Sequence, residues 1–192
     1  MPFSPILSAL DARSGTQVGA QVGSNDQTGT TIKTSFGPVV DGDTRLLLLG
    51  SLPGDKSLLH QQYYAHPQNR FWALMSAVLE TDLPGLDYVT RLATLRAHGV
   101  GLWDVVAKAR RAGSLDSQIR DRSDNDLPSL LKRLPGLQAI GFNGATAARI
   151  GLQVLGARAD AYAIIQLPSS SPAYTLAYGD KLAAWLRFVL GA

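Results

Sequence analysis

The chain contains no cysteine and only three histidines among its 192 residues. The absence of cysteine excludes disulfides, thiolate nucleophiles, iron–sulfur clusters and cysteine-ligated zinc, and is typical of proteins in a reducing cytoplasm. His60, His66 and His98 are too few and too scattered to suggest a metal site, so we expect no metal and no other cofactor. The chemistry must then come from ordinary side chains and the backbone.

Long apolar runs and a strong charge imbalance are also missing. No stretch approaches the roughly 20 apolar residues of a membrane span, and the first ten residues lack the basic start and apolar core of a signal peptide. We therefore expect a cytoplasmic, monomeric protein without a membrane partner. The formal net charge of +3 permits a polyanionic partner such as DNA without requiring one.

Large apolar residues are scarce near the N-terminus. From about Asp11 to Thr34 the sequence consists mainly of Gly, Ser, Thr, Gln and Asn, which cannot bury enough surface to offset the entropy of ordering. This predicts a flexible tail over residues 1–34 and a single domain over residues 35–192. Since Arg13 and Lys33 are the tail's only cations, it does not look like a DNA-binding arm.

The rest of the chain alternates strand-like and helix-like segments. The four leucines that end in Gly50 indicate a strand buried on both faces of a parallel sheet. The alternation predicts a three-layer αβα sandwich around a mainly parallel, four-stranded sheet. The polar segment 111–126 is predicted to be a long loop. The predicted strands are residues 46–50, 100–106, 137–142 and 161–167, and the predicted helices are residues 70–79, 86–97, a segment around 130, a segment ending near 155, and 179–190.

Ligands of open α/β sheets bind at the carboxyl ends of the strands, so Gly50 to Gly54 should form a floor and Tyr63 to Asn69 a wall. The loop Gly50, Ser51, Leu52, Pro53, Gly54 is suited either to cradling a phosphate or to forming a tight turn. Aromatic residues at 63, 64, 71 and 72 are usual in a core, but His66 and Asn69 interleave with them, a mixture that suits a pocket for a heterocycle. Asn69 is equally suited to capping a helix.

Two other sets of residues leave alternatives open. Asp104, on an otherwise apolar strand, should be paired, hydrogen-bonded or catalytic. The serines at 169–171 are suited to binding phosphate or to closing a turn. A hydrolase built on Ser51, His66 and Asp104 is disfavoured because the nucleophile elbow G-x-S-x-G is missing.

Three segments taken in order carry a resemblance to a known family. They are GSLPG at 50–54 followed by Ser57, YYAHPQNRFW at 63–72, and LPSSSPA at 167–173. From about Ser35 to its C-terminus the chain resembles the uracil-DNA glycosylase superfamily, specifically its hypoxanthine-DNA (deoxyinosine) glycosylase branch. The mismatch-specific uracil glycosylases share a similar loop and a similar His-Pro-x-Asn-Arg-Phe-Trp segment.

The departures from the uracil-directed branches imply where catalysis takes place. Leu52 stands where those branches place a water-positioning Asn or Asp, and an apolar side chain cannot orient water. In the hypoxanthine branch the Asn of the HPxN segment is catalytic, which implies that role for Asn69. Leu167 replaces the His or Asn that opens the second motif, and this puts uracil activity in doubt.

The same resemblance implies roles for further residues. Tyr64 should stack on the base, and Gly50 to Gly54, His66 and Asn143 should complete the base pocket. Ser57 and the loop Ser169, Ser170, Ser171, Pro172 should grip damaged DNA around the flipped nucleotide. The implied activity is a monofunctional DNA glycosylase that excises hypoxanthine. The alternatives are a uracil glycosylase acting on G·U mismatches and a non-catalytic nucleic-acid-binding module.

Overall fold

A parallel four-stranded sheet forms the middle of the protein. The computed structural model describes residues 31–190, with the strands in the order β3-β2-β6-β7. The buried run of leucines is the second strand of this order and pairs with a parallel neighbour on each side. The four strands are β2 (Leu46–Gly50), β3 (Val100–Asp104), β6 (Ala139–Asn143) and β7 (Ala163–Leu167).

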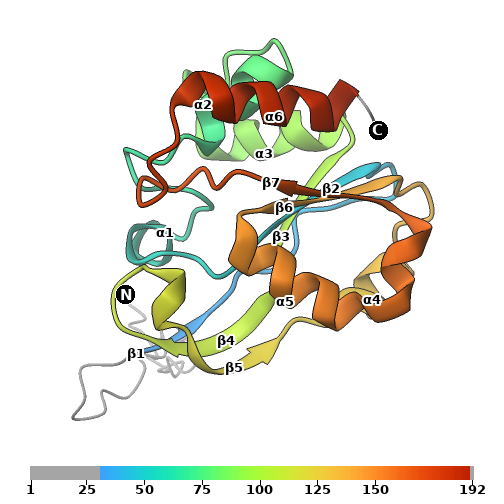
Figure 1. Ribbon diagram of the computed structural model, residues 1–192. Coiled ribbons are helices and arrows are strands. Elements are labelled where there is room, and N and C mark those ends of the chain that lie inside the picture. The colour runs from blue at the N-terminus through green and yellow to red at the C-terminus, as the bar shows by residue number, and fades with distance from the viewer. Residues whose placement is uncertain (1–30, 191–192) are drawn as a thin grey trace, which may run out of the picture.

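Helices cover both faces of this sheet, which confirms the predicted three-layer architecture (Figure 1). On one face lie α2 (Phe71–Val78), α3 (Tyr88–Ala97) and α6 (Tyr178–Leu190), and on the other lie α4 (Leu127–Leu131) and α5 (Ala145–Leu155). No helix in residues 31–190 is both long and apolar enough to cross a membrane.

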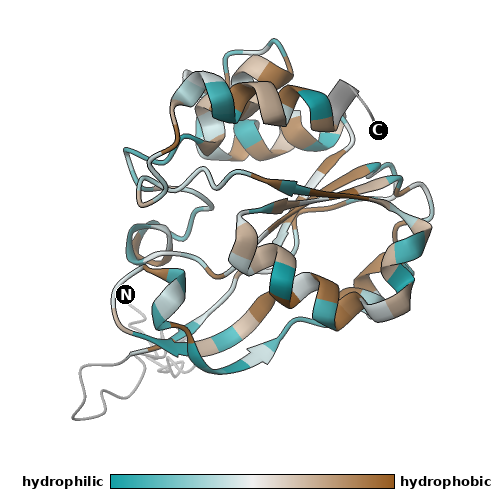
Figure 2. Cartoon of the chain, in the orientation of Figure 1, coloured by the Kyte–Doolittle hydropathy of each residue, from teal (hydrophilic) through white to brown (hydrophobic). Residues whose placement is uncertain are grey.

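The leucines of β2 show why the strand is apolar throughout. Leu46 and Leu48 pack into the core under α2, α3 and α6, whereas Leu47 and Leu49 pack into the core on the opposite face. Residues 47–49 are fully buried, and burial of each leucine contributes roughly 1.5–3 kcal/mol. Figure 2 shows the central strands as largely brown, while the surrounding helices mix brown and teal.

A second, antiparallel sheet was not predicted. Its strands are β1 (Thr31–Thr34), β4 (Val106–Arg111) and β5 (Arg120–Asp124), in the order β1-β4-β5. The prediction of one strand over residues 100–106 is wrong, because the chain leaves the parallel sheet after Asp104 and continues in the antiparallel sheet. The segment predicted to be a loop contains the last residue of β4, the short helix η1 (Asp116–Gln118) and β5.

The last four residues of the predicted tail form β1, which pairs with β4 along its whole length. The remainder of the predicted tail lies outside the described residues. The short helix α1 (Asp55–His60), which follows the GSLPG loop, was not predicted either. Two helix ends are fixed locally, since Asp126 caps α4 by accepting from Ser129 N–H at 3.0 Å and Gly99 has a φ of 70° after α3.

Candidate functional site

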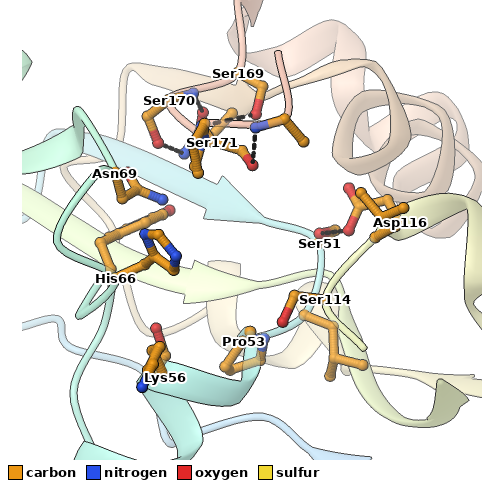
Figure 3. Close-up of a pocket in the computed structure, with 18 of the residues that line it drawn as sticks. Ser51, Pro53, Lys56, His66, Asn69, Ser114, Asp116, Ser169, Ser170 and Ser171 are labelled. Atoms are coloured by element: carbon orange, nitrogen blue, oxygen red, sulfur yellow. Dashed lines mark hydrogen bonds between the residues drawn. The ribbon is translucent and has the colours of Figure 1, made fainter. Parts of the chain in front are cut away.

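A cavity of about 450 Å³ lies where the parallel strands end, in the range typical of small-ligand pockets. Figure 3 shows its walls: the loop after β2, the segment before α2, the turn after β4 and the serine loop after β7. The cavity is lined by Ser51, Leu52, Pro53, Gly54, Asp55, Lys56, Ser57, Tyr63, Tyr64, His66, Asn69, Asp104, Ser114, Leu115, Asp116, Asn143, Ser169, Ser170, Ser171, Pro172, Ala173 and Tyr174.

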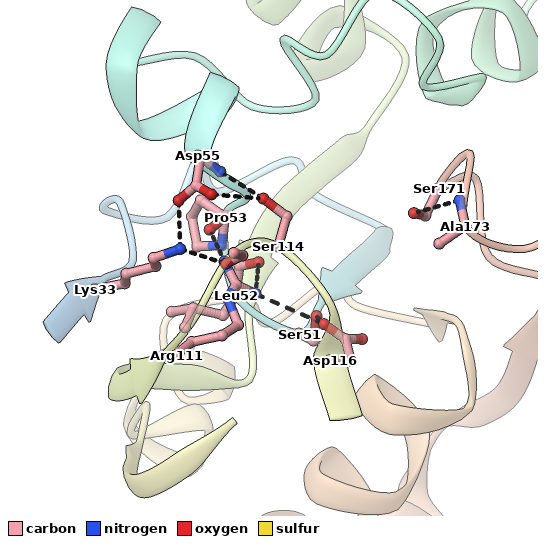
Figure 4. A network of polar contacts seen from close by, with 11 residues as sticks. Lys33, Ser51, Leu52, Pro53, Asp55, Arg111, Ser114, Asp116, Ser171 and Ala173 are labelled. Atoms are coloured by element: carbon pink, nitrogen blue, oxygen red, sulfur yellow. Dashed lines mark hydrogen bonds and ion pairs between the residues drawn. The ribbon is translucent and has the colours of Figure 1, made fainter. Parts of the chain in front are cut away.

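The GSLPG loop is held from beneath by Arg111 of β4 (Figure 4). This arginine is only 1% exposed, and its guanidinium donates to the carbonyl of Leu52 at 3.1 Å and to that of Pro53. Ser51 Oγ donates to Asp116 Oδ1 at 2.7 Å, and the same carboxylate lies 3.7 Å from Arg111. The loop therefore gets its shape from charged residues of the small sheet and the turn that follows it.

Asp55, at the start of α1, anchors the end of the same loop. Its carboxylate pairs with Lys33 of β1, and its N–H donates to Ser114 Oγ at 2.9 Å. A Cβ on Gly54 would come within 3.2 Å of that hydroxyl oxygen, so glycine permits the close approach of the two segments. The small sheet thus fixes both ends of the cavity floor.

Tyr64 forms a rigid aromatic wall. Its ring stacks on Phe71 with a centroid distance of 3.7 Å and an interplanar angle of 11°. Phe71 in turn meets the rings of Trp72 and Trp185 edge-on, at 5.1 and 5.7 Å. Tyr64 has a φ of 55°, an uncommon value for a non-glycine residue, and burial raises the pKa of its hydroxyl. One ring face is covered by Phe71, and the residue lines the cavity.

Asn69 is half-buried at the start of α2, and its side chain has a defined orientation. Asn69 Oδ1 accepts from Phe71 N–H at 2.9 Å, so this side chain satisfies one of the N–H groups at the start of α2. An amide oxygen has two lone pairs, so a second acceptor position remains. The neighbouring His66 accepts from Gln68 N–H through Nδ1 at 3.1 Å, and Nε2 is its other ring nitrogen.

The serine loop is fixed by the end of β6 and by α6. Asn143 Nδ2 donates to Ser170 Oγ at 2.9 Å, and Asn143 Oδ1 accepts from Ser170 N–H at 2.8 Å. The carbonyl of Ser170 accepts from Arg70 N–H at 3.0 Å, which joins this loop to the Asn69 segment. Lys181 of α6 donates to the Tyr174 carbonyl at 2.7 Å. Two loops distant in sequence are therefore held as one wall.

The structure separates the predicted DNA-contacting serines into two groups. Ser57 and Ser170 are 6% and 0% exposed, and their hydroxyl oxygens accept from Ala65 N–H and Asn143 Nδ2. These two serines hold the protein's own loops, which differs from the DNA contact implied by the resemblance. Ser169 and Ser171 are half-exposed and Pro172 is exposed, so they remain candidates for contact with a ligand outside the cavity.

All the predicted site residues line the cavity except Gly50, which lies behind it. A Cβ at Gly50 would come within 2.6 Å of Asp104 Oδ1 and 3.2 Å of Tyr64 Oη, so this glycine leaves room for both side chains. Sequence reasoning missed Arg111, Ser114 and Asp116 as parts of the site. The signal that pointed toward them was the unusual length of the polar segment 111–126.

The hydrolase interpretation is not supported by the geometry. Ser51 gives its hydroxyl proton to Asp116 rather than to His66. Asp104 lies at the end of β3 and its Oδ2 has no hydrogen-bond partner among the described residues, so it does not orient a histidine. The cavity therefore lacks an activated serine and instead offers an aromatic wall, an oriented amide and a buried carboxyl group.

Comparison with known proteins agrees with this arrangement. The model of the uracil DNA glycosylase superfamily matches residues 37–189. The chain belongs to this superfamily. The match spans the GSLPG loop, the Asn69 segment and the serine loop, so all the cavity walls lie within it.

Two curated relatives come from Methanosarcina, and both are named hypoxanthine DNA glycosylase. The M. acetivorans protein is 41% identical over 142 residues, covering 74% of this chain and 88% of the relative. The M. barkeri protein is 42% identical over 112 residues, covering 58% of this chain and 71% of the relative. A solution NMR structure described as a candidate uracil DNA glycosylase from M. acetivorans superposes with a TM-score of 0.74 and 38% identity, covering 83% of this chain and 97% of that one.

Proposed function

We propose that this protein is a monofunctional DNA glycosylase that removes a deaminated base, hypoxanthine first, and leaves an abasic site. The observation that carries the proposal is the meeting of the Tyr64 ring and the oriented Asn69 amide in one cavity of a glycosylase fold. The names of the two curated relatives support hypoxanthine as the base.

The substrate must reach this cavity by leaving the DNA helix. Rotating a nucleotide out of a duplex costs a few kcal/mol, and least where the pairing is weak. Deoxyinosine opposite thymine, the product of adenine deamination, is such a pair. The exposed Pro172 and the half-exposed Ser169 and Ser171 border the cavity, and we assign them the contacts with the DNA around the flipped nucleotide.

Inside the cavity, Tyr64 offers its free ring face to the flat base. Because Phe71 fixes the tyrosine ring from behind, little conformational freedom is lost when the base stacks. The remaining acceptor position of Asn69 Oδ1 orients a water molecule toward the sugar carbon. An amide does not take up the water's proton at neutral pH, so its contribution is orientation and polar stabilisation.

The test of the Asn69 assignment is the substitution Asn69→Ala. We expect at least a 10²-fold loss in the single-turnover rate of hypoxanthine release, since removal of one positioned polar group costs about 10²–10³-fold. Affinity for DNA containing an uncleavable inosine analogue should change little. The matched control is Gln68→Ala, the exposed neighbour. Equal cleavage by Asn69→Ala and the wild type would remove Asn69 from the mechanism.

The choice of base is tested with duplexes that carry inosine, xanthine or uracil opposite each normal base. We expect the highest rate on inosine. A higher rate on uracil in G·U pairs would instead support the function in the description of the structural relative. Binding of every duplex with no alkali-labile site in any of them would favour a non-catalytic DNA-binding module.

We infer hydrolysis without an amine nucleophile. Lys181 is committed to carbonyl groups of the serine loop and Lys33 to Asp55 and Gly113, while Lys56 lies exposed at the cavity rim. Reduction with borohydride during turnover should trap no covalent protein–DNA adduct. An adduct that disappears in Lys56→Gln would overturn this part of the proposal.

We propose that the protein works as a monomer on chromosomal DNA in the cytoplasm. Sedimentation of the active protein measures whether it is a monomer.

A further inference from the structure

Asp104 is a buried carboxyl group whose side chain has no assigned task. The residue is 3% exposed, and its Oδ2 lacks a hydrogen-bond partner in residues 31–190. Only its backbone is engaged, since its carbonyl accepts from Asn125 Nδ2 at 2.8 Å. A purely structural carboxylate in such a place would be hydrogen-bonded or paired, because an unpaired buried charge is costly. The group therefore needs another explanation.

The carboxyl group lies at the deep end of the cavity. Asp104 lines the cavity from the end of β3, directly beside Gly50 of β2 in the parallel register. The space that a Cβ on Gly50 would occupy is bounded by Asp104 Oδ1 and Tyr64 Oη, so both oxygens converge there. Asn69 is half-buried and Asp104 is almost fully buried. Because Asp104 Oδ1 converges with Tyr64 Oη, Asp104 is within reach of the edge of a base that stacks on the Tyr64 ring.

Burial, rather than the neighbouring charges, favours the protonated form of Asp104, since the larger of the two charge effects, that of Arg111, lowers its pKa. Burial raises its pKa to about 7, with Asp116 adding to the rise and Arg111 opposing it. Within residues 31–190, Arg111 is the cation that acts on it, and this guanidinium is already shared between loop carbonyls and Asp116. The tyrosines that face it, Tyr63, Tyr64 and Tyr88, carry no positive charge, and burial raises the pKa of each. The other titratable residues of the cavity wall are Asp55, Lys56, His66 and Tyr174.

A protonated carboxyl group gives a proton more readily than the neighbouring Tyr64 hydroxyl, whose pKa burial raises, and two other polar side chains of the cavity are already engaged. Asn143 Nδ2 is bonded to Ser170, and the Ser51 hydroxyl donates to Asp116. A purine that departs with the electron pair of the glycosidic bond carries negative charge spread over its ring nitrogens and O6, and N7 and O6 lie together on one edge of the base. A donor at that edge acts most strongly in a water-poor site.

We propose that Asp104 is a catalytic acid that protonates the departing purine at N7; the assignment rests on the proposed glycosylase function. The bond from C1′ to N9 breaks, and its electron pair stays with the base. The Asp104 proton forms the new N7–H bond, so the base leaves as neutral hypoxanthine. A water oxygen bonds to C1′ and loses one proton to solvent, and the Asp104 carboxylate regains a proton from solvent before the next turnover.

The first test compares the pH profile of single-turnover hypoxanthine release in the wild type and in Asp104→Asn. The wild-type rate should fall about tenfold per pH unit above the pKa of about 7. The asparagine of Asp104→Asn has nearly the same shape as aspartate but cannot give a proton. The rate of this variant at pH 6 should be 10²–10⁴-fold lower than that of the wild type, and it should not depend on pH above 7. Its affinity for an uncleavable inosine analogue should be retained. Asp160→Asn, on the exposed helix η2 (Gly156–Ala161), is the matched control and should keep the wild-type profile.

A second substrate makes the test independent of whether the variant folds. A duplex with 7-deazainosine presents a C–H group where N7 would accept the proton. The wild type should cleave it at least 10²-fold more slowly than inosine and without the decline above pH 7. Equal rates and equal pH profiles on the two substrates would overturn the assignment.

The two proposals fail in different ways. A wild type that releases hypoxanthine, together with an Asp104→Asn variant of equal rate and profile, overturns the role of Asp104 alone. A wild type that releases no deaminated base at any pH overturns the glycosylase function and the role of Asp104 with it.

Discussion

Arg111 and Asp104 are both buried and lie a few residues apart in sequence, yet the surroundings of Arg111 keep it charged and those of Asp104 favour its neutral form. The guanidinium is surrounded by the Leu52 and Pro53 carbonyls and the Asp116 carboxylate, so it stays charged although burial lowers its pKa. The Asp104 carboxyl group has no side-chain partner for Oδ2 within the described residues and its pKa rises to about 7. Arg111 therefore supports the GSLPG loop, whereas Asp104 can exchange a proton.

The raised pKa of Asp104 predicts a dependence of stability on pH. Between its unfolded value of 3.8 and about 7 the unfolded chain has lost this proton while the folded chain keeps it. The free energy of unfolding should therefore fall as pH rises through this window, by up to about 1.4 kcal/mol per unit, and should level off above it. Urea unfolding of the wild type and Asp104→Asn at pH 4.5 to 8 measures the difference. Parallel curves for the two proteins would mean that the carboxyl group is ionised in the fold.

The residue-scale features were only partly predictable. The motif around Asn69 and Tyr64 indicated which side chains meet in the cavity, because those residues are close in sequence. The burial of Arg111 could not be predicted, since its acceptors are carbonyls 59 and 58 residues earlier in the chain. Asp104 was recognised as anomalous from its apolar neighbours, but its lack of a partner is a property of the packed structure.

At the scale of elements, the parallel sheet could be predicted from the sequence and the antiparallel sheet could not. A strand buried on both faces must be continuously apolar, which makes β2 and β6 recognisable. The strands β4 and β5 carry several charged residues, and β5 has no buried residue. Such short, polar strands have a composition close to that of a loop. Pairing fixes their conformation, since β4 pairs with β1 on one side and with β5 on the other.

The packing of α5 on β6 gives a test at this scale. Gly151 lies where a Cβ would overlap the Phe142 ring, which is fully buried. Gly151→Ala should therefore destabilise the protein by about 1–3 kcal/mol through overpacking, although alanine favours helix. Gly179→Ala in the first turn of α6, where a Cβ meets nothing within 4 Å, is the matched control and should be neutral or slightly stabilising. Melting temperatures measure both, and equal values would show that Phe142 can move aside.

For the molecule as a whole, charge bears on the affinity for DNA. A net charge of +3 is modest, so binding should depend on a few well-placed cations rather than on a general positive field. The distribution of these cations was not evident in the sequence, where arginines 110, 111, 120 and 122 lie close together. Arg111 is buried in the fold, and Arg122 is bonded to Asp124 and Gln153.

Lys56 at the cavity rim should be one of the cations that contact a phosphate. For each such contact, a fourfold rise in salt concentration lowers the affinity by a factor of about 3.5, because binding releases condensed counterions from the DNA. Lys56→Gln should lower the slope of log affinity against log salt by about one. Lys132→Gln, an exposed residue just after α4, should leave the slope unchanged. Titration of a labelled inosine duplex at several salt concentrations measures both, and an unchanged slope in Lys56→Gln would place the DNA backbone elsewhere.

Two sets of hydrogen bonds shape the cavity, those of Arg111 to the GSLPG loop and those of Lys181 to the serine loop. They also set the order in which the cavity can form during synthesis. The GSLPG loop leaves the ribosome well before Arg111, and the serine loop is secured only when Lys181 of the final helix has emerged. A nascent chain therefore holds Asn69 and Tyr64 long before it holds a finished pocket. We therefore expect base excision only from chains that include α6.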